Sequence, residues 1–198
     1  MNRTQAPQHG TTSRQGMTLV ELMVSLVIFG VVIAVVFGFL TESRQSYAAT
    51  RQKAQYQQGL RAVMSIVTRD VRSAGCDPTN AGFERFALAD LRSLRCRMDL
   101  NGDTDVTDTG PDEDVTYVFD PDTGDLTRTV AGGAAVVVLR NLQDVTFNYY
   151  DGDGNLLNNL PLNATDRAEV AAVDLVMAGE AVDHVPVSYT TRMAVRNN

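Results

Sequence analysis

The sequence predicts an α+β protein in which one long N-terminal helix precedes an antiparallel β-sheet. Two patterns lead to this prediction. No proline occurs between Met17 and Pro78, and the apolar residues of that stretch first run almost without interruption and then recur at helical spacing. After Gly75 the chain changes to short segments rich in Val, Thr, Tyr and Phe, which turn residues separate. One long helix followed by a run of strands is typical of an α+β fold whose sheet packs on the outer half of the helix.

Length and composition limit the classes of protein that fit. The 198 residues suffice for one modest globular domain in addition to a leader and a long helix. The formal net charge is -7, and the body of the chain has no cluster of Lys or Arg. Because an acidic surface repels phosphates, we expect no direct binding to nucleic acid.

The segment Met17–Leu40 is apolar apart from two hydroxyl residues and Glu21. Its nineteen residues from Leu22 onward carry no charge. As a helix they would span about 28 Å, close to the roughly 30 Å hydrocarbon core of a bilayer. Arg3 and Arg14 precede this segment, so the positive-inside rule predicts a cytoplasmic N-terminus and a body that crosses the membrane.

Two residues do not fit a plain N-terminal anchor. Glu21 places an ionisable group within the apolar run, where such groups are costly and usually have a specific partner. Gly16 is a small residue that precedes the apolar run, whereas ordinary signal peptidase cuts after such a run. An anchor alone therefore explains the hydrophobicity of the segment but neither of these residues.

The string GMTLVEL at residues 16–22 resembles the N-terminal signal of the type IV pilin superfamily, with Gly, a hydrophobic residue and then Glu four positions further on. The resemblance implies that a prepilin peptidase cuts between Gly16 and Met17 and methylates the new N-terminus. It also implies that Glu21 pairs with the terminal amine of a neighbouring subunit, so that neither charge is left alone in hydrocarbon. Met17 departs from the Phe of major pilins, a change that minor pilins tolerate.

The helix is predicted to continue past the membrane. Its apolar residues there recur at spacings of three and four, which places them on one face; they are Leu60, Val63, Met64, Val67 and Val71. We expect a single helix from about Met17 to Ala74, capped near Gly75. Within the membrane half, Gly30, Ala34 and Gly38 form a row of small residues that would permit close approach of another helix.

A second resemblance narrows the family. The segment Ser65–Pro78, which reads SIVTRDVRSAGCDP, is similar to the helix end of PilW-type minor pilins, relatives of the J-type pseudopilins of type II secretion. The segment Thr191–Asn197 is similar to the last strand of that group. The resemblance implies four parts: a leader at 1–16, a membrane or filament-core helix at 17–40, an amphipathic helix at 41–75 and a periplasmic or extracellular β-rich domain at 76–198.

Six segments have the composition of strands, namely 114–119, 125–130, 135–140, 144–150, 168–178 and 186–196. Turn sequences such as PDTG at 121–124 and DGDG at 151–154 separate them. These strands would form the sheet that covers the exported half of the helix.

An acidic loop between the helix and these strands has two interpretations. Asp99, Asn101, Asp103 and Asp105 alternate as in a calcium loop, with Asp112 or Asp114 needed in place of the terminal acid. The alternative is a solvated acidic turn without an ion. The similar run at 151–155 is more typical of a hairpin turn than of a calcium site.

The two cysteines of the chain, Cys76 and Cys96, both follow the membrane segment and can form at most one bridge within it. In an oxidising compartment such bridges persist, and closing a loop of this length stabilises a fold by roughly 3 kcal/mol. We therefore predict a disulfide, the alternative being two buried free thiols.

The sequence favours a structural role over catalysis. His9 lies in the leader and His184 stands alone near the C-terminus, and no nucleophile, metal or nucleotide-binding motif occurs. The leading hypothesis is a minor type IV pilin that helps to initiate or prime a pilus. It would partner prepilin peptidase and other pilins, first as a single-pass inner-membrane protein and then at the cell surface. The alternatives are a J-type minor pseudopilin of type II secretion and a membrane-anchored calcium-binding or adhesive module that never polymerises.

Overall fold

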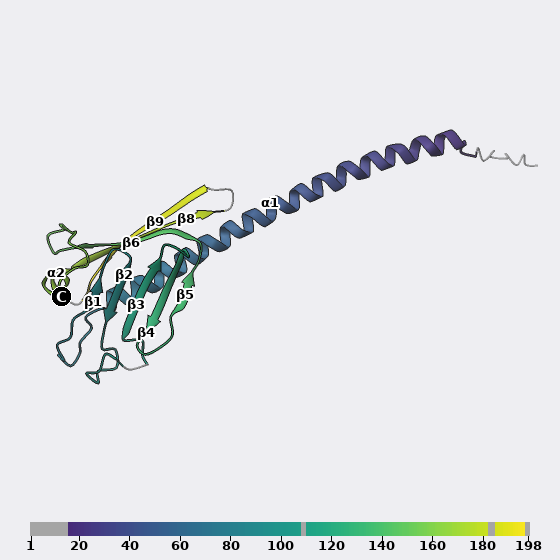
Figure 1. Ribbon diagram of the computed structural model, residues 1–198. Coiled ribbons are helices and arrows are strands. Elements are labelled where there is room, and N and C mark those ends of the chain that lie inside the picture. The colour runs from purple at the N-terminus through teal and green to yellow at the C-terminus, as the bar shows by residue number, and fades with distance from the viewer. Residues whose placement is uncertain (1–15, 108–109, 182–184, 197–198) are drawn as a thin grey trace, which may run out of the picture. The chain divides into compact units, whose positions relative to one another are not determined.

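The structure, a computed structural model, describes residues 16–107, 110–181 and 185–196 (Figure 1). The chain divides into two compact units, Met1–Ala48 and Ala49–Asn198. The described residues form the helices α1 (Leu19–Ser73) and α2 (Ala164–Glu169) and the strands β1 (Phe86–Ala89), β2 (Ser93–Arg97), β3 (Asp114–Asp120), β4 (Asp125–Val130), β5 (Val136–Leu139), β6 (Leu142–Tyr150), β7 (Leu156–Leu157), β8 (Ala172–Ala181) and β9 (Val185–Ala194).

Helix α1 confirms the prediction of one long helix, since it runs from Leu19 to Ser73 without a break. It ends where the sequence indicates. Gly75 has a φ of 76°, in the left-handed region that glycine adopts readily after a helix. The amide of Gly75 then donates a 2.9 Å hydrogen bond to the carbonyl of Arg97, which ties the end of the helix to β2.

Two antiparallel sheets, rather than the single expected sheet, pack with the helix. The first has the strand order β1-β2-β3-β4-β5 and the second β7-β6-β8-β9. The six predicted strands correspond to β3, β4, β5, β6, β8 and β9. The prediction was wrong at Ala168 and Glu169, which belong to α2, because the side chain of Asn163 caps that short helix by accepting a hydrogen bond from the Asp166 amide.

The hairpin of β1 and β2 was not predicted. In β2 the buried residues Leu94 and Cys96 alternate with the half-buried Arg95 and Arg97, so a period of two was present. Arginine is not characteristic of strands, and its density in this segment hid the alternation. The carboxylate of Asp114 on β3 stabilises these arginines, because it lies 2.5 Å from Arg95 Nη2 and 3.3 Å from Arg97 Nε.

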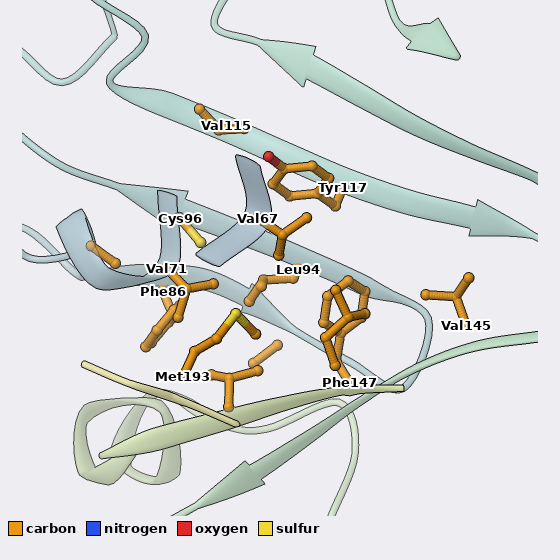
Figure 2. Packing of buried hydrophobic residues seen from close by; sticks show 14 of the residues in the cluster. Val67, Val71, Phe86, Leu94, Cys96, Val115, Tyr117, Val145, Phe147 and Met193 are labelled. Carbon is orange, nitrogen blue, oxygen red and sulfur yellow. The ribbon is translucent and has the colours of Figure 1, made fainter. Parts of the chain in front are cut away.

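The hydrophobic core of the second unit lies between the apolar face of α1 and both sheets. Leu60, Val63, Val67 and Val71 of the predicted stripe are buried, and Met64 packs against them. Figure 2 shows Val67 and Val71 among side chains of both sheets. The largest buried side chains from the sheets are Tyr117, Tyr149, Phe86, Phe147, Leu94, Leu126, Leu175, Met177 and Met193. Each such side chain contributes about 1.5–3 kcal/mol by leaving water.

Candidate functional site: assembly helix and acidic loop

The residues of the predicted processing site lie just ahead of α1. Gly16 and Met17 precede the first helical residue, Leu19, and Met17 is 63% exposed. Thr18 caps the helix: its hydroxyl accepts a 3.3 Å hydrogen bond from the Glu21 amide, and its carbonyl accepts one of 3.1 Å from Leu22. The sequence Thr-x-x-Glu is the pattern of a capping box. The peptide bond between Gly16 and Met17 is therefore outside the helix.

Glu21 occupies the first turn of α1, where the helix dipole favours a negative charge. Its side chain is exposed, and within the described residues its carboxylate forms no hydrogen bond or salt bridge. The sequence analysis singled it out as the assembly residue. The structure places it where a group from another molecule can reach it.

The first half of α1 is apolar on all sides. Its large hydrophobic side chains are exposed, from 37% at Ile33 to 74% at Leu19, and the helix is long and apolar enough to cross a membrane. A helix of this kind needs an apolar environment or other helices around it. At Gly30 and Gly38 an added Cβ would meet nothing within 4 Å, so the packing of this chain does not itself require these small residues. They remain available for a neighbouring helix.

A buried charged network fastens the second half of α1 to the first sheet. Asp70 of α1 is 4% exposed and accepts hydrogen bonds from the Tyr117 hydroxyl at 2.6 Å and from Arg128 Nη2 at 3.0 Å. The same Arg128 nitrogen lies 3.0 Å from Asp112, which follows the acidic loop. Burial, and then the neighbouring Asp70 carboxylate, raise the pKa of Tyr117 well above its ordinary value. The hydroxyl therefore remains a donor to Asp70.

The acidic loop folds around two buried carboxylates. Asp99 and Glu113 are both 0% exposed. Asp99 accepts hydrogen bonds from the amides of Gly102 at 2.5 Å and Thr104 at 3.2 Å, and Glu113 accepts one of 2.7 Å from Leu100. Carboxylate oxygens of Asp99, Asp103 and Glu113 lie within 4.8 Å of one another. Such proximity of like charges is unfavourable unless protons or a cation offset it.

Two residues of the predicted ligand set, Asp99 and Asp103, lie in this cluster of carboxylates together with Glu113, and Asp105 lies outside it. The side-chain amide of Asn101 donates to Asp103 at 2.9 Å, and the carboxylate of Asp105 accepts from the amide and hydroxyl of Thr107. Sequence spacing could not reveal Glu113, because the loop returns to it across a dozen residues. The feature of the sequence that could have indicated Glu113 is its position in the run of acidic residues just before a strand.

The predicted disulfide between Cys76 and Cys96 is absent from the structure, where both thiols are free. Cys96 is 0% exposed and points into the core from β2 (Figure 2), whereas Cys76 is half-buried just beyond the end of α1. The carbonyl of Cys76 accepts a hydrogen bond from the Asp99 amide, so the backbone of Cys76 lies next to Asp99, three residues after Cys96. Burial raises the pKa of the Cys96 thiol. It is held as a packed, protonated side chain.

A hollow of about 410 Å³ lies next to Gly75. Its charged lining residues are Asp77, Glu84, Arg85 and Arg167. Arg167 already donates to the Leu162 carbonyl and, at 2.9 Å, to Glu84. No Ser, Thr, Cys, His or Lys is among the residues that line this hollow. His9 and His184 lie outside the described residues.

Comparison with known proteins gives a match to a family and a match to a relative. Residues 11–37 match the family described as the prokaryotic N-terminal methylation motif. This range contains the predicted processing site, Glu21 and most of the apolar run. The chain is also 32% identical, over 76 residues, to the pilin-like protein PilA3 of Thermus thermophilus. That match covers 38% of this chain and 33% of the relative, so the chain spans about a third of the relative's length.

The match to the methylation motif is consistent with the fold. Residues 19–37 of the matched range belong to the exposed apolar half of α1, and two antiparallel sheets follow, packed with the second half of that helix. The two matches, with the long N-terminal helix and the antiparallel sheets that follow it, support placing the chain in the type IV pilin and pseudopilin superfamily.

Proposed function

We propose that the chain is a minor type IV pilin, a structural subunit that helps to initiate or prime pilus assembly after prepilin peptidase has cut between Gly16 and Met17. The observation that carries the proposal is Glu21, an exposed carboxylate in the first turn of an all-round apolar helix within the methylation motif. A membrane anchor that acts alone has no use for such a group. A helix that joins others in a filament does.

In the proposed mechanism the first half of α1 holds the subunit in the inner membrane, with its N-terminus cytoplasmic and its body on the other side. Cleavage creates a terminal amine at Met17. When the helix enters the filament, Glu21 pairs with the amine of a neighbouring subunit, and each charge offsets the desolvation cost of the other. The small residues Gly30 and Gly38 let the helices approach closely.

Two measurements test this role. Mass spectrometry of the native protein should find an N-terminal, methylated Met17. In cells that assemble the filament, Glu21→Ala should leave membrane insertion intact and abolish incorporation. Glu42→Ala is the matched control, because Glu42 is an exposed acid on the same helix beyond the apolar run. Recovery of the native protein with its first sixteen residues attached would contradict the proposal.

The same cells distinguish a pilus from a type II secretion pseudopilus. Deleting the gene of a minor pilin should lower the number of surface pili and spare secretion of folded enzymes. Deletion of a J-type pseudopilin should have the reverse effect. Loss of secretion with normal piliation would therefore replace the proposed role with the pseudopilin role.

We also propose that the acidic loop binds Ca²⁺. The support is the approach of the Asp99, Asp103 and Glu113 carboxylates to within 4.8 Å of one another. Two oxygens bound to one calcium ion lie at most about 5 Å apart, twice the usual metal–oxygen distance. Three carboxylates supply three to six of the oxygens that calcium needs, and carbonyls or water would complete the set. An ion there would offset the mutual repulsion of the carboxylates.

Calorimetric titration of the full chain in detergent with CaCl₂ tests the site. We expect saturable binding and a rise in thermal stability with calcium concentration. Asp103→Asn should weaken binding by tenfold or more, whereas Asp105→Asn should not, because Asp105 lies in the same loop outside the cluster. No heat at millimolar calcium, or equal effects of the two variants, would contradict the proposal.

A further inference from the structure

Three of the four sheet edges in the described part of the chain are too short or too irregular to accept another strand. Edge strands β1 and β5 have four residues each, and β7 has two. The pairing of β1 with β2 shifts register between Phe86 and Leu88, and that of β4 with β5 shifts between Leu126 and Thr127. The Ala89 carbonyl on β1 also accepts a hydrogen bond from Leu162. Short strands and bulges are the usual protection of an edge.

The fourth edge, β9, has no such protection. It is ten residues long and pairs with β8 over its whole length without a shift in register. The Val195 amide donates to the Ala171 carbonyl, which makes the neighbouring pair Ala194–Ala172 one without its own hydrogen bonds. Because such pairs alternate along an antiparallel ladder, every second residue before Ala194 also directs its N–H and C=O groups away from β8; these residues are Arg192, Thr190 and Ser188. Pro186, next in the series, has no N–H, so the usable edge runs from Ser188 to Ala194.

The charge on this part of β9 does not guard the edge. Arg192 extends across the sheet, where its guanidinium donates to Asp174 of β8 at 2.7 Å and 2.8 Å. It also lies 4.2 Å from the centre of the Tyr150 ring on β6. An edge arginine usually repels incoming strands by standing over the edge. Here the Arg192 side chain points away from the edge, toward β8 and β6. The other side chains on this face of the edge, those of Ser188 and Thr190, are small and exposed.

We propose that the free edge of β9, from Ser188 to Ala194, binds an extended segment of a different pilin subunit as an additional strand of the second sheet. The groups on this edge are backbone donors and acceptors at strand spacing, and the ligand that satisfies them is another extended backbone. The inference rests on the proposed function, which supplies the partner: in a filament, other pilins are the proteins at hand. A second copy of this chain is the less suitable occupant, because pairing of β9 with β9 would occupy the edges of both copies in a closed dimer.

The experiment uses the full chain in cells that assemble the filament. The photo-reactive amino acid p-benzoylphenylalanine replaces Ser188, and irradiation links it to whatever lies along the edge. We expect mass spectrometry to identify, in the adduct, an extended segment of another protein with a prepilin-type N-terminus. Thr190→Pro removes an outward N–H and keeps the β8 pairing, so it should lower the yield of adduct about tenfold. Thr190→Val changes only the side chain and should leave the yield unchanged.

A second variant keeps the test decisive if Thr190→Pro does not fold. Thr190→Lys leaves every backbone group in place and adds a charge at the edge, so it should also lower the yield. The inference is overturned if both variants retain the normal yield, or if the adduct contains only a second copy of this chain. Glu21→Ala, measured in the same cells, separates the two proposals. If Glu21→Ala is incorporated normally, the pilin role fails; if it is excluded while the β9 variants link normally, only the added strand fails.

Discussion

The Tyr117 hydroxyl lies 2.6 Å from the Asp70 carboxylate, a buried contact that joins α1 to the first sheet. The residues are 47 positions apart, and Arg128 reaches the same carboxylate from β4. Hydrophobic packing alone would let the helix slide or rotate against the sheet at little cost. Because the Asp70 carboxylate must lie within hydrogen-bonding distance of both Tyr117 and Arg128, it fixes one position of the helix.

Removing Asp70 should therefore destabilise the second unit more than removing the hydroxyl of its partner. Asp70→Ala leaves Arg128 and the Tyr117 hydroxyl without their acceptor, at a cost of about 3–5 kcal/mol in the free energy of unfolding. Tyr117→Phe loses one hydrogen bond to a charged group, about 1.5–3 kcal/mol. Urea unfolding of the full chain in detergent measures both. Tyr47→Phe is the control, because Tyr47 is 75% exposed; equal stability of all three variants would contradict the expectation.

A side chain at Gly179 should displace Tyr56. An added Cβ would overlap the hydroxyl oxygen of Tyr56, which donates a 3.0 Å hydrogen bond to the Asn141 carbonyl. We expect Gly179→Ala to lower the free energy of unfolding by about 1–3 kcal/mol, because the Tyr56 side chain must move away and lose its hydrogen bond to the Asn141 carbonyl. Adding Tyr56→Phe should restore part of this loss. Gly152→Ala is the matched control, since a Cβ there meets nothing within 4 Å.

The two thiols should differ in reactivity. Cys76 is half-buried and should react with a maleimide in the folded protein, whereas Cys96 is fully buried and should react only after unfolding. Mass spectrometry of the labelled full chain counts the adducts before and after denaturation. One adduct and then two is the expected result. No adduct in the unreduced, unfolded protein would restore the disulfide.

Stability should fall at alkaline pH. Burial raises the pKa of Cys96 and of Tyr149, so the folded state keeps protons that the unfolded state loses. The unfolded chain then binds fewer protons than the folded chain above about pH 8.5 for the thiol and about pH 10 for the phenol, and the free energy of unfolding decreases with pH. Urea midpoints between pH 7.5 and 9.5 measure the slope. Cys96→Ala should make it shallower, and an unchanged slope would contradict the role of this thiol.

The sequence allowed prediction of the features that depend on local pattern. The course of α1 follows from the absence of proline and from one change of periodicity near Leu40. Glu21 was recognised because a charge in an apolar run stands out without any knowledge of the fold. β3 and β4 were found for a similar reason, since each is a short β-branched segment between turns.

Features that depend on distant contacts were missed or misread. Asp70 appeared as part of a motif, but its partners are Tyr117 and Arg128, which only the folded sheet brings to it. The disulfide predicted for Cys96 depends on the direction of its side chain on β2, a strand that the sequence pattern did not reveal, and in the structure both thiols are free. Division of the strands between two sheets likewise depends on long-range pairing.

Only Met17 and Thr18 stand between the expected cut and the first helical residue. Hydrolysis at that bond would create an ammonium group within one turn of the Glu21 carboxylate on the same molecule. In a single mature subunit the new terminus would therefore lie close to that subunit's own acid, and on assembly the acid would exchange this partner for the amine of a neighbour.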